Sequence, residues 1–192
     1  MSKLLFVAFP ISEKWSDVFV KYQESHTGDE FTKWTTKENL HMTLVFLGAV
    51  EEDLISEITD ALSEIASIQR PFSLEFKGVE YGPEGKSPSM IWARWKDDIN
   101  YGVLAGRAIE ELSYILGKLE TLKPIPHVTL ARFNKEAKPK VLPELGSMGH
   151  ERESMEIARM CLMESKMTQT GSTYSTLATF DFSTGGEISE DL

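Results

Sequence analysis

Apolar residues recur every three or four positions in three stretches of the chain, a pattern that predicts amphipathic helices. The first stretch covers residues 12–22, where Ser12 could cap the helix start. The second covers residues 51–67, whose acidic start suits the positive end of the helix dipole. The third follows Asp98 and must end before Pro124, because proline disrupts a helix interior. The residues expected to face inward are Trp15, Val18, Phe19, Tyr22, Leu54, Ile55, Ile58, Leu62, Ile65, Tyr101, Leu104, Ala105, Ala108, Leu112, Ile115 and Leu116.

Alternating apolar and polar residues, together with short apolar runs, predict five strands. These strands cover residues 4–9, 72–77, 90–95, 155–164 and 174–181. Residues 82–88 are rich in glycine and proline and predict a loop. The helices and strands do not alternate regularly, so the pattern favours an antiparallel α+β fold with helices on its outer faces over a doubly wound parallel sheet.

The sequence His-x-Thr-Leu occurs twice, at residues 41–44 and 127–130, with its histidines 86 residues apart. Each copy follows a predicted helix, and each is expected to form a strand. Side chains two apart on a strand share a face, so each histidine should point the same way as its threonine. This repeat predicts two similar lobes, related by a pseudo-twofold axis, that each contribute one strand to a shared cleft.

Two imidazoles and two hydroxyls in one cleft could hydrolyse a cyclic phosphodiester without a metal ion or other cofactor. One histidine would take a proton from water while the other protonates the departing oxygen. Imidazole can serve either role because its unperturbed pKa is about 6.5. Threonine hydroxyls could donate to the non-bridging phosphate oxygens. A single His-x-Thr segment would favour a structural histidine, but its recurrence in both halves favours catalysis.

Composition places the chain among ordinary globular proteins, with 192 residues, 41% of them hydrophobic. We expect one bilobal domain over residues 1–182 and a disordered polar tail over residues 183–192. A net charge of −10 argues against a broad basic face that grips long nucleic acid. Positive charge is instead local, since residues 123–140 hold five basic side chains and only one acidic one. That local charge suits a short anionic ligand.

Cellular context follows from the cysteine content and from the N-terminal apolar run. Cys161 is the only cysteine, which excludes an internal disulfide and a cysteine metal cluster and predicts a reducing compartment, the cytoplasm. The apolar run 4–9 ends at Pro10 and is too short for a membrane span or a signal peptide. We therefore expect no membrane association, and a monomer.

The paired His-x-Thr-Leu segments resemble those of the 2H phosphoesterase superfamily. Within it, the chain is similar to the bacterial and archaeal RNA 2′,3′-cyclic phosphodiesterases, also called 2′-5′ RNA ligases, over residues 3–182. The matching segments are residues 6–10, 34–48, 126–132 and 165–174 with Gly171. The resemblance implies a bilobal fold in which two antiparallel sheets flank a central cleft. It also implies hydrolysis of RNA 2′,3′-cyclic phosphate ends to 2′-phosphates.

The resemblance also implies roles for individual residues. His41 would donate a proton to the leaving 3′ oxygen and His127 would accept one from water, although near-symmetry leaves the reverse assignment open from the residues alone. Thr43 and Thr129 would contact the phosphate.

Arg132 matches a basic position of the family that suits phosphate binding. It lies five residues after His127, so strict alternation turns it away from the cleft unless the strand ends or bulges before it. Trp34 and Tyr174 are further candidates for substrate binding, Trp34 by stacking on a terminal base, with packing in the core as the alternative for both.

Two other functions stay open at this point. The substrate could be a small cyclic or 2′-5′ linked nucleotide instead of an RNA end. The chain could also be a nucleotide-binding module without turnover, although a binder has less need of both histidines and both threonines. Reverse 2′-5′ ligation is a further possible activity of the family.

Overall fold

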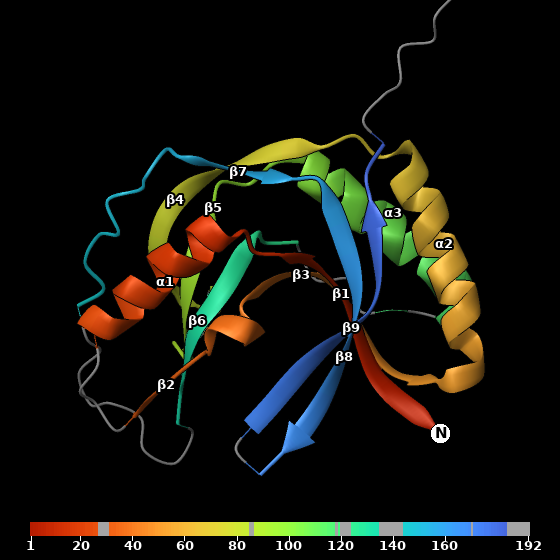
Figure 1. The fold of residues 1–192 in the computed structure, drawn as a ribbon, viewed down its shortest axis with the longest axis horizontal. Helices are drawn as coiled ribbons and strands as arrows, with labels where there is room; N and C mark the ends of the chain where they lie inside the picture. Colours follow the sequence, from red (N-terminus) through yellow and green to blue (C-terminus); the bar gives the residue numbers. More distant parts are fainter. Residues whose placement is uncertain are drawn as a thin grey trace, which may run out of the picture.

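The computed structural model describes residues 1–26, 31–84, 87–117, 119, 124–134, 144–169 and 171–183 (Figure 1). In chain order its elements are β1 (Ser2–Pro10), α1 (Glu13–Ser25), β2 (Thr32–Trp34), the 3-10 turn η1 (Lys37–Asn39), β3 (His41–Glu51), the 3-10 turn η2 (Glu52–Leu54), α2 (Ile55–Ile68), β4 (Phe72–Gly82), β5 (Met90–Trp95), α3 (Ile99–Leu116), β6 (His127–Phe133), β7 (Ser154–Ile157), β8 (Arg159–Thr168) and β9 (Gly171–Asp181).

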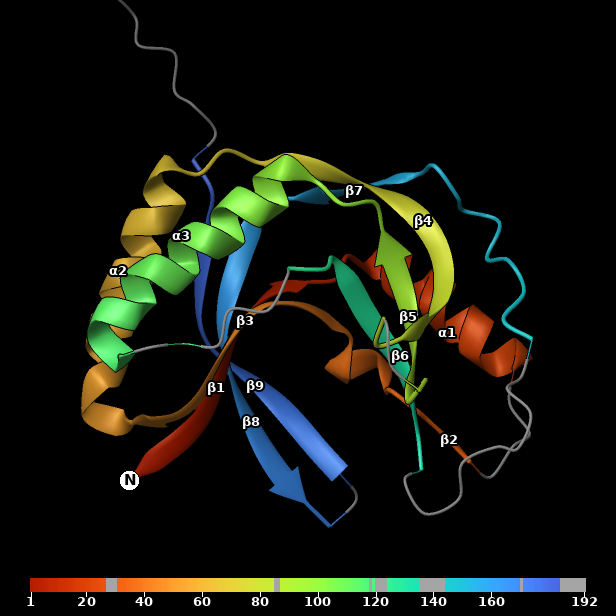
Figure 2. The same cartoon turned by 180° about the vertical axis from the view of Figure 1, so that it is seen from behind.

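The strands form one antiparallel sheet in the order β7-β4-β5-β6-β3-β1-β8-β9, with β2 paired to the free side of β6. Met42 on β3 pairs with Val128 on β6, and this is the pairing that joins the two halves of the sheet. On either side of it the strands splay apart into two lobes, as Figure 2 shows from behind. The α+β class and the two-lobed arrangement are thus confirmed, with the two expected sheets joined at one point.

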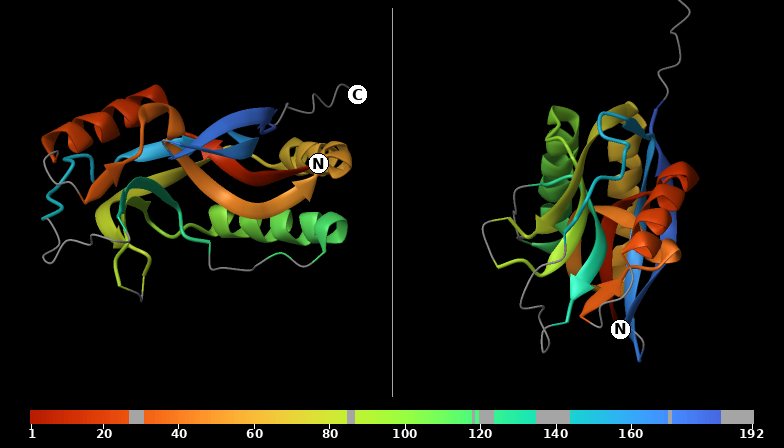
Figure 3. Two further views of the ribbon diagram at one scale, coloured as in Figure 1. Left: turned by 90° about the horizontal axis from the view of Figure 1, so that it is seen from below. Right: turned by 90° about the vertical axis from the view of Figure 1, so that its left-hand side faces the viewer.

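The three predicted helices are present, and they cover the lobes separately. Trp15 of α1 packs against Phe76 and Trp95 of the β4–β5 pair, at ring-centroid distances of 5.0 and 5.7 Å. Helices α2 and α3 lie together against the other lobe, and Figure 3 shows α1 and α3 on opposite sides of the strands. The sequence's inward-facing positions account for this, since Phe19, Ile58 and Leu104 are each fully buried. These inward-facing side chains of the helices therefore form part of the core.

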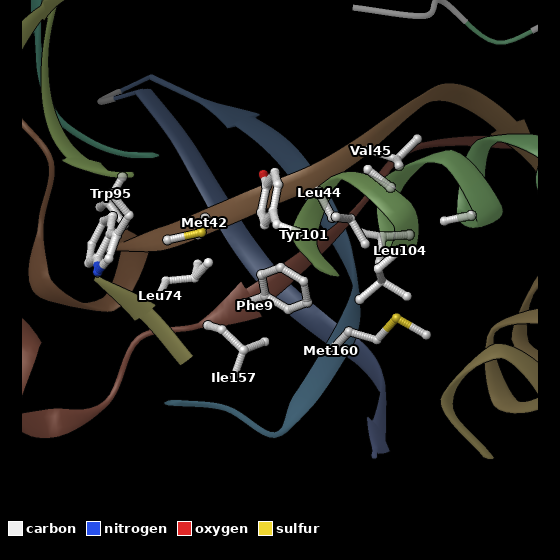
Figure 4. Close-up of a cluster of buried hydrophobic side chains, with 14 of the residues drawn as sticks. Phe9, Met42, Leu44, Val45, Leu74, Trp95, Tyr101, Leu104, Ile157 and Met160 are labelled. Atoms are coloured by element: carbon white, nitrogen blue, oxygen red, sulfur yellow. The ribbon is translucent and has the colours of Figure 1, made fainter. Parts of the chain in front are cut away.

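Core packing fixes the orientation of the His-x-Thr strands. Met42 and Leu44 of β3 point into the hydrophobic core beside Phe9, Tyr101 and Leu104 (Figure 4). Because alternate side chains of a strand face opposite ways, burial of these two forces His41 and Thr43 to the other face. Val128 and Leu130, both 0% exposed, do the same for β6. The predicted face assignment of both motifs is confirmed.

Three local expectations were wrong. Residues 155–164 form not one strand but parts of two, β7 and β8, which separate at Ala158 and pair with β4 and with β1 and β9. Competition between two sheet edges divides this apolar run. Ser12 occupies the N-cap position of α1, but its side chain makes no capping hydrogen bond. In addition, α2 begins at Ile55, because β3 and η2 take up residues 51–54.

The division at residue 182 and the disorder of the tail stay predictions, because residues 184–192 lie outside the described part of the chain. No helix among the described residues is long and apolar enough to cross a lipid bilayer.

Capping of α3 gives a test of these local interactions. The Asp98 carboxylate accepts hydrogen bonds from the backbone N–H groups of Asn100 and Tyr101, at 2.8 and 3.1 Å. Asp98→Ala should lower the free energy of unfolding by about 1 kcal/mol, the usual cost of losing such a cap. Ser12→Ala, at a cap position without a side-chain bond, should change it by much less. Equal losses in the two variants, measured by urea unfolding, would contradict this account.

Candidate active site

The Met42–Val128 pair brings the two motifs together crosswise. In an antiparallel pair of this register, His41 lies next to Thr129 and Thr43 lies next to His127. All four side chains are half-buried and share the face opposite the core. The histidines therefore stand at diagonal corners of a small rectangle, with a threonine beside each. An anion between them would meet an imidazole on either side.

Each histidine is held by the same backbone contact. The Nδ1 atom of His41 lies 2.7 Å from the carbonyl oxygen of Asn39, and that of His127 lies 2.8 Å from the carbonyl oxygen of Ile125. A carbonyl oxygen can only accept, so Nδ1 carries the hydrogen in both rings. This leaves Nε2 of each imidazole to take or give a proton at the open face.

Aromatic rings fix the two imidazole planes. The His41 ring contacts Phe6 and Tyr174 at centroid distances of 4.9 and 4.8 Å, and these two rings also contact each other, at 5.3 Å. The His127 ring stacks on Trp92 at 4.0 Å and 29°. These contacts restrict the rotation of both imidazoles and remove water from one side of each.

Arg94 anchors the segment that carries His127. Its backbone is directly opposite His127 in the β5–β6 register, and its side chain is only 3% exposed. The guanidinium makes an ion pair with Asp97 at 2.6 Å and donates to the Pro126 carbonyl oxygen at 3.3 Å. Because Pro126 immediately precedes His127, this contact helps to position the start of β6.

Burial is the main cause of a lowered pKa at both histidines. It brings the pKa of His127 down to about 4, with further lowering by the positive charge of Arg94 and, to a lesser degree, by His41 and Arg132. The pKa of His41 is also lowered, by burial and by Arg132, against the opposing hydrogen bond to Asn39. Both shifts favour neutral imidazoles near pH 7 in the free protein.

A bulge solves the orientation problem of Arg132. In the β5–β6 register, Ile91 pairs with Ala131 and Trp92 pairs with Thr129, so Leu130 has no partner. Leu130 and Ala131 are both buried as a result, and Arg132 emerges on the face of His127. With strict alternation, a residue five positions after His127 would lie on the opposite face of the strand. The extra residue in the bulge brings Arg132 to the same face as His127.

Strand β3 has the same irregularity. Val7 pairs with Val45 and Ala8 with Thr43, so Leu44 is the unpaired residue. Leu44 and Val45 are buried, and Phe46 emerges on the face of His41 with 65% of its surface exposed. Phe46 and Arg132 thus occupy equivalent positions in the two motifs.

Side chains from neighbouring elements support the bulged segments. The Tyr101 hydroxyl donates to the Thr43 carbonyl oxygen at 2.8 Å, and the Thr35 hydroxyl donates to the Thr129 carbonyl oxygen at 2.8 Å. The Gln23 amide donates to the Leu130 carbonyl oxygen at 3.2 Å. The backbone carbonyl groups near each bulge therefore have hydrogen-bond donors. These bonds hold each bulge at its position in the strand.

Known proteins resemble the chain in sequence and in fold. Residues 10–92 match the family model LigT like Phosphoesterase. Curated relatives named RNA 2′,3′-cyclic phosphodiesterase include one from Archaeoglobus fulgidus, 30% identical over 92% of this chain and 99% of the relative. Another, from Aeropyrum pernix, is 32% identical over 85% of this chain and 93% of the relative. The chain belongs to the LigT-like phosphoesterase family.

Solved structures agree on the fold. The protein TT0787 of Thermus thermophilus superimposes with a TM-score of 0.79 at 24% identity, over 95% of this chain and 98% of that one. Escherichia coli LigT in complex with 3′-AMP gives 0.77 at 19% identity, over 95% and 99% of the two chains. The family fold is thus retained at low identity.

The remaining predicted residues of this LigT-like phosphoesterase have different surroundings. Tyr174 contacts the His41 ring, within the site. Trp34 pairs with Ala131 and meets Tyr22 of α1 at 6.2 Å, so it faces the helix and not the histidines, and the structure does not favour its role in base stacking. Its neighbour Lys33 pairs with Arg132 and shares that residue's face. Of the basic stretch 123–140, Arg132 lies within the described residues and the four lysines lie outside them.

Sequence reasoning missed Phe46, Trp92, Arg94 and Gly82. Arg94 carried a usable signal, since an arginine inside an apolar strand needs a buried partner. Gly82 is revealed only by packing, because a Cβ atom there would lie 2.2 Å from the Trp92 ring. No described group of three or more His, Cys, Asp or Glu side chains is arranged to hold a metal ion.

A substitution at Gly82 tests whether stacking on Trp92 positions the His127 ring. Gly82→Ala should displace the Trp92 indole, disturb the stacked His127 ring and lower kcat at least tenfold. Gly106→Ala is a matched control in α3, where a Cβ atom meets nothing within 4 Å. That control should retain activity and gain up to about 1 kcal/mol of stability from the better helix propensity of alanine. Unchanged kcat in a folded Gly82→Ala protein would contradict the support.

The lowered pKa of His127 also predicts how stability depends on pH. The unfolded chain binds a proton to this histidine near pH 6.5, whereas the folded protein does so only near pH 4. Stability should therefore fall as the pH drops through this window, by up to about 3 kcal/mol for this group. Urea unfolding of His127→Gln should show a shallower loss over the same window. Parallel losses in the variant and the unmodified protein would count against the assignment.

Proposed function

We propose that this LigT-like phosphoesterase hydrolyses RNA 2′,3′-cyclic phosphate ends to 2′-phosphates without a metal ion. The observation that carries the proposal is the diagonal placement of two neutral, Nδ1-anchored imidazoles about a small polar face. The curated relatives named RNA 2′,3′-cyclic phosphodiesterase support the choice of substrate.

In the proposed reaction, the Nε2 atom of His127 accepts a proton from water as the water oxygen bonds to phosphorus. The bond between phosphorus and the 3′ oxygen breaks, and His41 gives its proton to that oxygen. A 2′-phosphate and a free 3′ hydroxyl result. Attack and departure occur on opposite sides of phosphorus, which matches the separation of the two imidazoles across the pair of strands.

The electrostatics favour this division of roles. His127 has the pKa of about 4 and remains neutral as a base. His41 must be protonated to act as the acid, and the negative charge of a bound phosphodiester would raise its lowered pKa. Arg132 could bind a non-bridging oxygen and offset the charge of the phosphate, while the hydroxyls of Thr43 and Thr129 donate to the others.

The same geometry would also catalyse 2′-5′ ligation, in which the 5′ hydroxyl of a second RNA takes the place of water. His127 would accept the proton of that hydroxyl as its oxygen bonds to phosphorus, and His41 would protonate the departing 3′ oxygen. Hydrolysis should dominate in dilute solution because water is in large excess.

A short RNA ending in 2′,3′-cyclic phosphate, incubated with the purified protein and EDTA, tests the proposal. We expect a 2′-phosphate product, unchanged turnover with the chelator, and a bell-shaped dependence of kcat/KM on pH. His41→Ala and His127→Ala should each lose at least two orders of magnitude in kcat, the usual contribution of a positioned acid or base. A 3′-phosphate product would show that the 2′ oxygen, and not the 3′ oxygen, is the leaving group. Full activity in both variants would exclude this site.

A further inference from the structure

The two lobes meet again at one edge of the candidate site. Strand β2 extends from one lobe and the β8–β9 hairpin from the other, and Figures 1 and 2 show both at the same end of the molecule. The side-chain amide of Asn39, in the turn η1, donates to the Ser172 carbonyl oxygen on β9 at 3.1 Å. The carbonyl oxygen of Asn39 accepts the Nδ1–H of His41. One residue therefore holds both the hairpin and a candidate catalytic ring.

Lys33 of β2 reaches from one lobe to the other at this edge. It lies directly opposite Arg132 in the β2–β6 register, and side chains directly opposite each other in an antiparallel pair share a face. Lys33 is therefore on the face of Arg132 and His127. Its side chain ends at the hairpin, where a Cβ atom on Gly171 would lie only 2.6 Å from the Lys33 Nζ atom. Gly171 has no side chain, which leaves room for the ammonium group.

The ammonium group of Lys33 comes from the lobe of His127 but lies on the side of His41. Gly171 precedes Tyr174 by three residues, roughly 10 Å along β9 at about 3.3 Å per residue. The Tyr174 ring contacts the His41 ring at 4.8 Å. Lys33 is also exposed to solvent. Its charge is thus placed beyond the reacting atoms, beside the path that leads away from His41.

The direction of the proposed reaction decides which part of a substrate lies on that path. His41 protonates the 3′ oxygen, so the terminal ribose must lie on the His41 side of phosphorus. In an RNA chain, the 5′ oxygen of this ribose carries the next phosphodiester, which is an anion. In a mononucleoside cyclic phosphate, the same oxygen carries only a hydrogen. An ammonium group on this side therefore favours the RNA, since lysine binds phosphate as a point charge.

We propose that Lys33 binds the phosphate on the 5′ side of the terminal nucleotide, and that this contact selects RNA ends over mononucleoside cyclic phosphates. The inference rests on the proposed function, because the position of the ribose depends on His41 as the acid. Arg132 and Lys33 then bind separate phosphates, the cyclic one and the next one. A net charge of −10 gives little attraction for RNA farther along, so the selection is made at this first phosphate.

The test compares two substrates that differ only in one phosphate. Adenosine 2′,3′-cyclic phosphate has a free 5′ hydroxyl, and its 5′-phosphorylated form carries a charge at the expected position. The unmodified protein should have a KM about tenfold lower for the phosphorylated substrate, the effect of one charge-assisted contact. Lys33→Met should remove this difference by raising the KM of the phosphorylated substrate alone, with kcat within twofold. Lys33→Arg, which keeps the charge, should retain most of the difference.

Lys166→Met is the matched control on the same hairpin. Lys166 is the neighbour of Ser165, the strand partner of Tyr174, so its side chain lies on the opposite face, where it pairs with Glu164 at 3.3 Å. This variant removes the same charge from the chain and should keep the KM difference of the unmodified protein. A comparable loss in Lys166→Met would show that net charge sets the preference, and the inference would be wrong.

Equal KM values for the two substrates in the unmodified protein, or an equal effect of Lys33→Met on both, would overturn the role of Lys33. If neither substrate were hydrolysed, the proposed function would fail instead. Calorimetric titration with adenosine 3′-monophosphate and adenosine 3′,5′-bisphosphate would still decide the inference. Lys33→Met should weaken binding of the bisphosphate about tenfold and that of the monophosphate less than twofold. Equal changes in the two Kd values would refute the contact.

Discussion

The site depends on the backbone pairing of Met42 with Val128. The two motifs lie far apart in the chain, and their lobes have separate helical covers. This one pairing sets the register in which His41 meets Thr129 and His127 meets Thr43. A shift by one residue would turn one motif toward the core, because side chains on a strand alternate between faces. Hydrophobic burial of Met42 and Val128, both 0% exposed, opposes such a shift.

Around this register, the protein disfavours positive charge on the two histidines that we propose to be catalytic. Burial and nearby guanidinium groups disfavour imidazolium at both histidines. In the proposed mechanism, the free site holds two neutral imidazoles, and His41 becomes an acid when the anionic substrate binds. Protonation of His41 would then depend on occupancy of the site, so that substrate binding itself produces the general acid. Arg94 contributes to the same effect, because it helps to fix the position of His127 and adds positive charge near it.

Much of this arrangement was predictable from the sequence, because repetition is a strong signal. The paired His-x-Thr-Leu segments predicted two strands with cleft-facing histidines, and period 3.6 located the three helices. Positions that depend on long-range pairing were not predictable. Simple alternation left Arg132 facing away and did not single out Phe46, because no local pattern shows an unpaired residue in a strand. Gly82 and Arg94 matter through contacts with residues distant in the chain, and no spacing rule reveals those.

The paired bulges change how related chains should be aligned and interpreted. Along each strand, the site-facing positions advance by two and then by three, giving 41, 43 and 46 in one lobe and 127, 129 and 132 in the other. A single deletion between the second and third positions would remove the bulge and restore regular alternation, so Phe46 or Arg132 would keep the face of the histidines but would lie about 3 Å nearer to its threonine along the strand. Differences in chain length at Leu44 or Leu130 therefore change how far Phe46 or Arg132 lies from the histidines, and not the face on which it lies.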